Sequence, residues 1–173
     1  MSESFDLGDV GVFTAGAIGP PGQRTFYLQA RTGPSSVAWK VEKQQVAALG
    51  EFLRRMLADL PQPEAVPDAA SVALVEPVES EWPVGALGVA YDGEEDRILV
   101  AADELVETDE EGNPLPGVEQ ATARVRITRA QAVAFVDTAE RLVESGRPLC
   151  PLCGRPMDPD GHICPRMNGH GVH

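Results

Sequence analysis

Short apolar stretches separated by glycine and proline residues characterise the first part of the chain. Residues 10–15, 25–31 and 36–41 are rich in β-branched and aromatic side chains, and turn-forming sequences lie between them. In the third stretch, Val37 and Trp39 alternate with more polar neighbours, which is the two-residue period of a strand with one buried face. The pattern therefore predicts three strands.

A helical pattern follows the third strand. Apolar residues recur at three- and four-residue intervals over residues 46–60, and Pro61 ends the run. The same order then returns in the second part of the chain, where the pattern predicts three strands and a helix at residues 85–91, 97–102, 118–127 and 129–144.

This shared order suggests an internal duplication. Residues 39–49 align with residues 125–135, and the alignment places Val41 over Ile127 and Gln45 over Gln131. The alternative is coincidence, since any amphipathic strand followed by an amphipathic helix aligns in a similar way. The expected fold is α+β, with a duplicated three-strand-plus-helix unit that forms antiparallel sheet and packs two helices. We expect an α+β core over residues 1–147, with possible repeats at 1–63 and 82–147, and a separate tail over residues 148–173.

The net charge of the chain disfavours some classes of binding partner. The 27 acidic and 14 basic residues give a formal charge of −13, which disfavours nucleic-acid binding through phosphate contacts. Between Glu64 and Glu119 there are 16 acidic residues and one basic residue, Arg97, a balance of −15, so one edge of the molecule should be strongly negative. The sequence has neither a secretory signal pattern nor an apolar run of about 18 residues, so we expect a cytoplasmic protein without a membrane span.

A few basic residues are weak candidates for an anion site. Arg124 and Arg126 share one face of their predicted strand, and Lys40 corresponds to Arg126 in the proposed repeat. Together with Arg24, they are candidates for binding a phosphorylated or carboxylated small molecule in a cleft between the repeats. The alternative is that they simply solvate the exposed face of a sheet.

The most specific chemistry lies in the last 24 residues, which contain all three cysteines and all three histidines. Cys150 and Cys153 form a Cys-x-x-Cys-Gly sequence that resembles a zinc knuckle. A turn at residues 158–161 would bring His162 and Cys164, two positions apart on a strand, to the same ion. Three thiolates and one imidazole suit a closed, structural Zn²⁺ site, so we expect no catalysis at the metal.

Other interpretations of these residues remain open. His170 is the alternative fourth ligand, because Asn168-Gly169 is another turn that could bring it to the metal. A redox role for Cys150 and Cys153 is disfavoured because no helix is expected to begin at the pair and lower a thiol pKa.

Several segments together carry a resemblance to a known family. They are Phe13-Thr-Ala-Gly16, residues 22–30, Lys43-Gln-Gln-Val46 and, most specifically, residues 150–169. On these segments the chain resembles an uncharacterised, mainly actinobacterial family of small proteins, classified as a domain of unknown function. The resemblance implies a cytosolic protein with a zinc-ribbon-like ending, and it implies His162 rather than His170 as the ligand. It implies no activity.

Two hypotheses for function follow. The first is a non-enzymatic binding or adaptor protein whose zinc ribbon presents Arg155, Arg166 and Asn168 to a protein or an anionic ligand. The second is an enzyme or small-molecule-binding protein that uses the basic cleft. No phosphate-binding loop, nucleophile elbow or metalloprotease helix motif occurs in the sequence to favour an enzyme.

Overall fold

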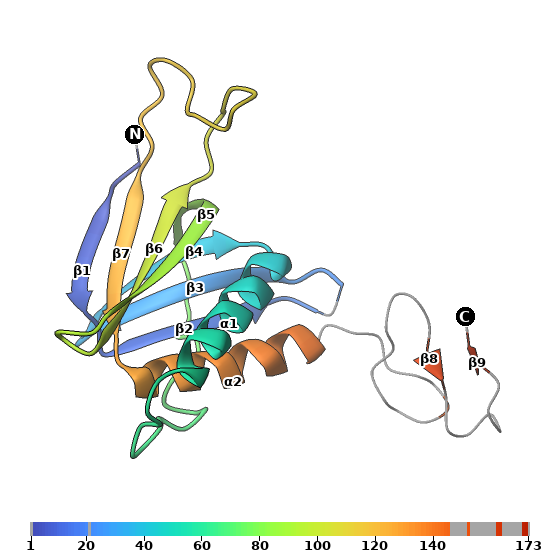
Figure 1. Ribbon diagram of the computed structural model, residues 1–173. Helices are drawn as coiled ribbons and strands as arrows, with labels where there is room; N and C mark the ends of the chain where they lie inside the picture. The colour runs from blue at the N-terminus through green and yellow to red at the C-terminus, as the bar shows by residue number, and fades with distance from the viewer. Residues whose placement is uncertain (1, 21, 146–151, 153–161, 164–170, 173) are drawn as a thin grey trace.

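The computed structural model describes residues 2–20, 22–145, 152, 162–163 and 171–172, and it consists of a seven-stranded sheet with two helices (Figure 1). The strands lie in the order β1-β7-β6-β5-β4-β3-β2. The elements are β1 (Phe5–Asp9), β2 (Val12–Ile18), β3 (Thr25–Thr32), β4 (Ser35–Val41), α1 (Lys43–Ala58), β5 (Ser80–Asp92), β6 (Arg97–Glu104), β7 (Thr122–Ile127) and α2 (Arg129–Ser145). A two-stranded piece, β8 (His162–Ile163) with β9 (Gly171–Val172), belongs to the tail. The predicted α+β class is confirmed, whereas the expectation of a wholly antiparallel sheet is wrong, because β1 pairs with β7 and β4 pairs with β5 in parallel. No helix among the described residues is long and apolar enough to cross a membrane.

Strand β1 is the element that the sequence pattern did not predict. It pairs in parallel with β7, so its partner lies more than a hundred residues away in the sequence. The strand also contacts an aromatic residue that is far away in the sequence. Phe5 lies edge-on against Trp39 of β4, with 5.9 Å between the ring centroids. Just before the strand, the carbonyl of Glu3 accepts a 2.8 Å hydrogen bond from the indole nitrogen of Trp82. Tertiary contacts, rather than local pattern, therefore hold β1.

The sheet is strongly curled. β1 and β2 are at opposite edges of the strand order, yet only Val10 and Gly11 separate them in the chain. The amide of Val10 donates to the carbonyl of Arg126 on β7, and the amide of Gly11 donates to the carbonyl of Arg31 on β3. The chain therefore passes from one edge of the sheet to the other within two residues, and the curled sheet and the helices enclose one continuous apolar core.

The two halves of the sheet have the same element order. Strands β2, β3 and β4 are antiparallel and lead into α1, and strands β5, β6 and β7 are antiparallel and lead into α2. The halves join through parallel pairing of β4 with β5. The helices cross closely at Gly50, where an added Cβ would lie 3.0 Å from the Cβ of Ala139. A small residue at this position therefore lets the helices approach each other.

Each helix begins with the same glutamine contacts. The side-chain oxygen of Gln45 accepts from the amide of Glu42, and that of Gln131 accepts from the amide of Thr128, both at 2.8 Å. The amide nitrogen of each side chain donates to two consecutive carbonyls of the other half, within β5 for Gln45 and just before β2 for Gln131. For Gln45 these are Val84 (3.0 Å) and Gly85 (3.4 Å), and for Gln131 they are Val10 (2.8 Å) and Gly11 (2.9 Å). We therefore treat Gln45 and Gln131, Gly85 and Gly11, and Leu87 and Phe13 as corresponding residues.

The connection from α1 to β5 crosses the face of the sheet opposite the helices. Leu74 packs so closely on Gly16 of β2 that an added Cβ on Gly16 would lie 2.7 Å from the Cβ of Leu74. The side chain of Gln29, which is 1% exposed, both accepts from the amide and donates to the carbonyl of Val75, each at 3.0 Å. These contacts fix the connection against β2 and β3.

Candidate functional site

The predicted zinc ligands lie almost entirely outside the described residues. Cys150, Cys153 and Cys164 are outside them, as is the alternative ligand His170. His162 belongs to β8, whose backbone pairs in antiparallel fashion with β9. No group of three or more His, Cys, Asp or Glu side chains that could hold a metal ion occurs within the part of the chain that the structure describes. The zinc site therefore stays a prediction.

The four basic candidates do not all lie together. Arg124 and Arg126 lie on β7, whereas Lys40 lies on β4, and strands β5 and β6 separate the two strands. Arg24 precedes β3, where it donates to the hydroxyl of Ser145 at 3.0 Å and lies 5.5 Å from the ring centroid of Phe26. Arg126 faces Asp9 and Asp92, each at 3.7 Å. The structure thus brings Arg124 and Arg126 together and places Lys40 and Arg24 elsewhere.

A charged cluster connects the β5–β6 turn to the start of α2. Arg129, the first residue of α2, donates to both carboxylate oxygens of Asp96, at 2.9 and 3.1 Å, and also to the carbonyl of Pro61. The hydroxyl of Tyr91 donates to Asp96 at 2.8 Å. These hydrogen bonds, from Arg129 first and Tyr91 second, hold the pKa of the Asp96 carboxyl below its ordinary value. The cluster joins three segments that are distant in sequence.

We expect Asp96→Asn to lower the thermal unfolding midpoint at pH 7. Because the pKa of Asp96 is lower in the folded than in the unfolded state, its ionic stabilisation is fully present above the unfolded value of about 3.9 and is lost as the pH falls through the folded value. The difference between wild type and variant should therefore shrink below about pH 4. Asparagine suits the test because Asp96 has a φ of 51°, a left-handed conformation that asparagine tolerates.

Thermal melts across pH, with Glu94→Gln in the same turn as the control, provide the measurement. The control removes an exposed carboxylate and should leave the midpoint nearly unchanged. An Asp96→Asn difference that stays constant from pH 7 to pH 3 would contradict the role assigned to the ion pair.

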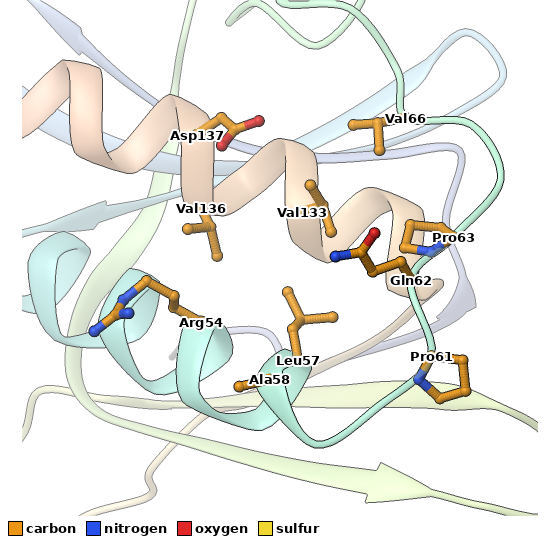
Figure 2. A pocket seen from close by; sticks show the side chains of 10 residues that line it. All are labelled: Arg54, Leu57, Ala58, Pro61, Gln62, Pro63, Val66, Val133, Val136 and Asp137. Atoms are coloured by element: carbon orange, nitrogen blue, oxygen red, sulfur yellow. The ribbon is translucent and has the colours of Figure 1, made fainter.

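A cavity of about 440 Å³ lies between the two helices and the connection after α1 (Figure 2). Leu57 of α1 and Val133 and Val136 of α2 form its apolar part, and the proline-containing connection closes one side. Arg54 and Asp137 lie at its rim, and the guanidinium of Arg54 is held by Glu51 at 2.6 and 3.0 Å. The cavity therefore offers mainly apolar contact.

A second hollow, of about 420 Å³, lies between α1 and β5, and we call it the α1–β5 groove. Apart from Gln45, its lining is apolar or glycine: Ala48, Leu49, Phe52, Gly85, Leu87, Gly88 and Val89. Phe52 is 54% exposed although it is a large aromatic residue. Leu87 and Val89 are half-buried even though they share the inner face of the sheet with fully buried residues of β6. The groove thus leaves part of the core-facing surface of β5 uncovered.

The corresponding place on the other half is covered. There α2 packs against β2 more extensively than α1 packs against β5, and the rings of Phe135 and Phe13 stack with centroids 5.1 Å apart. The hollow next to Gln131, Gly11 and Phe13 has only about 210 Å³, and Pro67, Ser71 and Val72 form its other wall. Packing of α2 therefore covers the position that stays open beside β5, and the chain's own connection borders the smaller hollow that is left.

Sequence reasoning did not identify the groove. Leu87 and Val89 have the pattern of an ordinary buried strand, and nothing local distinguishes them from residues that are fully covered. The signal in the sequence that could have indicated the groove was Phe52, a large aromatic residue that lies off the apolar stripe of its helix. Chemically, the arrangement favours recognition of apolar side chains, and all three histidines lie outside the core, at residue 162 and beyond.

Comparison with known proteins places the chain in a family. A family model described as "Protein of unknown function (DUF3090)" matches residues 5–164. Neither the curated proteins nor the solved structures include one that matches the chain.

Proposed function

Since the chain belongs to the DUF3090 family of proteins of unknown function, we propose its role from its own surfaces: it is a non-enzymatic binding module that takes up a segment of a protein partner in the α1–β5 groove. The observation that carries this proposal is the partly uncovered inner face of β5, at Leu87 and Val89. Exposed apolar surface that continues a core costs free energy in water, at roughly 25 cal/mol per Å². Such surface is typical of places where another molecule binds.

The comparison between the two halves supports this role. In one half, a segment of the chain and an aromatic pair cover the strand that follows the glutamine contact, whereas in the other half this position is open. We propose that the halves derive from one duplicated unit, and the corresponding glutamine contacts support this origin. On this basis the α1–β5 groove is a packing position that both halves share, left available in one of them for an external segment.

We further propose that the tail holds a structural Zn²⁺ ion. Cys150, Cys153, His162 and Cys164 supply the ligands in this proposal, with His170 as the alternative to His162. Four protein ligands leave no open position for a substrate water, so the ion would stabilise the tail and present its basic residues to the partner. The chemistry of free thiolate ligands fits the reducing cytoplasm as the compartment.

The second hypothesis, an enzyme or a binder of anionic small molecules, has less support. It requires Arg24, Lys40, Arg124 and Arg126 to converge, whereas only the last two share a strand and Arg126 already faces two carboxylates. The binding-module proposal uses a surface that the described residues form.

Isolation of the tagged full chain from native extract tests the proposed function. We expect one protein to be retained in a stoichiometric ratio, and the same protein to bind again when both components are purified separately. Ala48→Trp should abolish its retention, because Ala48 is exposed and lines the groove, whereas Gln44→Trp, an exposed position outside the lining, should not. Equal retention by both variants would place the binding surface elsewhere on the molecule.

A further inference from the structure

We propose that the segment received by the α1–β5 groove is a short amphipathic helix with apolar side chains on one face and basic side chains at both ends. This inference rests on the proposed function and specifies its partner. It follows from the dimensions of the groove, from what borders the corresponding position, and from the charges at its two ends.

The apolar part of the groove has the length of a short helix. The floor runs along β5 from Gly85 to Val89, four steps of about 3.3 Å, or about 13 Å. A helix covers that distance in about nine residues, so two or three apolar side chains spaced three or four positions apart fit it. Leu105, which is 61% exposed, lies next to the Gly85 end of the floor, since an added Cβ on Gly85 would lie 2.9 Å from the Cα of Leu105.

The corresponding position on the other half is bordered by a turn of the chain itself. Residues 69–72 form a turn in which the amide of Ser71 donates to the carboxylate of Asp68 at 2.8 Å. Val72, at the end of this turn, is 6% exposed and borders the hollow next to Phe13. A turn that inserts an apolar side chain beside the glutamine and glycine is therefore the arrangement that this chain itself uses.

The segments that continue from both ends of the groove floor carry carboxylates. Beyond Val89, β5 ends in the turn that carries exposed Glu94 and Glu95. Beyond Leu105, the chain enters the acidic connection between β6 and β7, which begins with exposed Glu107 and extends away from the sheet (Figure 1). None of these three carboxylates forms an ion pair with another described residue. The ends of the groove therefore favour a partner with positive charges.

Charge also argues against a second copy of the chain as the occupant. Two of the three basic residues of α1, Arg54 and Arg55, pair with Glu51, and the stretch from Glu64 to Glu119 has a balance of −15. Two copies meeting through this surface would bring like charges together, which costs free energy at an interface. The same charges stabilise a complex with a basic partner segment.

Fluorescence anisotropy with labelled synthetic peptides tests the inference on the full-length protein. The probe is a peptide of about 14 residues with leucines on one helical face, two lysines at each end, and alanine and glutamine elsewhere. We expect binding to wild type that weakens about tenfold when the terminal lysines become glutamates, and that weakens as salt rises. Ala48→Trp should weaken binding at least about tenfold by filling the groove, whereas Gln44→Trp should not.

Two further controls separate the apolar and ionic parts. The Glu94→Gln, Glu95→Gln double variant should bind the lysine peptide several-fold more weakly and should bind a glutamine-ended peptide unchanged. A scrambled peptide with the same composition but leucines all around the helix should bind at least about tenfold more weakly. Equal binding of the scrambled and ordered peptides would overturn the amphipathic helix, and equal binding of lysine- and glutamate-ended peptides would overturn its basic ends.

The remaining outcomes distinguish this inference from the proposed function. If no peptide binds while a purified partner still binds in an Ala48→Trp-sensitive manner, the helix is wrong and the binding module stands. If no peptide binds and no purified partner binds in an Ala48→Trp-sensitive manner, the helix inference and the proposed binding module are both wrong. A wild-type dimer in solution that Ala48→Trp converts to monomer would assign the groove to a second copy and overturn the inference.

Discussion

Replacing Phe135 by alanine is expected to lower the free energy of unfolding by about 3 to 5 kcal/mol. Phe135 is 1% exposed and stacks on Phe13 of β2 at 5.1 Å between ring centroids. The substitution removes the aromatic contact and leaves a cavity where α2, which follows β7, covers the first strand of the other half. Urea unfolding monitored by circular dichroism measures the loss.

Phe52→Ala is the matched control for this prediction. It removes the same side chain from a position that is 54% exposed, so the loss should stay below about 1 kcal/mol. Equal losses for the two variants would mean that the contact between α2 and β2 does not hold the halves together. The control also removes one wall of the α1–β5 groove and should therefore weaken peptide binding while leaving the fold intact.

Purified wild-type protein is expected to contain about one equivalent of zinc, and His162→Ala is expected to lose it. A closed site of three thiolates and one imidazole depends on every ligand, so removal of one ligand should lower the affinity enough for the ion to be lost during purification. His170→Ala should keep the metal. Elemental analysis of the three proteins gives the zinc content.

Circular dichroism of the same samples shows whether the α+β core of each variant is folded, so that metal loss is not confused with global unfolding. Loss of zinc in His170→Ala alone would make His170 the ligand in place of His162. Wild-type protein without zinc, or with two of its three cysteines joined in a disulfide, would overturn the structural zinc proposal as a whole.

Local patterns predicted most of the fold because each element has a clear period. The alternation around Trp39 predicted β4, and the three- and four-residue spacing over residues 46–60 predicted α1. The alignment of Gln45 with Gln131 anticipated two side chains with the same contacts at the same place in their helices. These features depend on neighbouring residues, which sequence reasoning can evaluate.

The features that were missed depend on distant contacts. β1 forms because β7 and Trp39 lie beside it, and β5 begins at Ser80 rather than Gly85 because its first residues pair with β4 before the strand reaches β6. The groove exists because α1 covers β5 less completely than α2 covers β2. Sequence periodicity reports which face of an element is apolar, but it does not report how much of that face a later element covers.

The pairing of β1 with β7 has a consequence for biosynthesis. The first strand of the chain finds its partner only after residues 122–127 have left the ribosome, so the nascent chain carries an unpaired amino-terminal strand throughout most of translation. Parallel pairing across such a sequence separation gives the domain a high contact order, which slows folding. This strand carries the acidic residues Asp6 and Asp9. Their charges repel the same residues of a neighbouring nascent chain and so oppose premature edge-to-edge association.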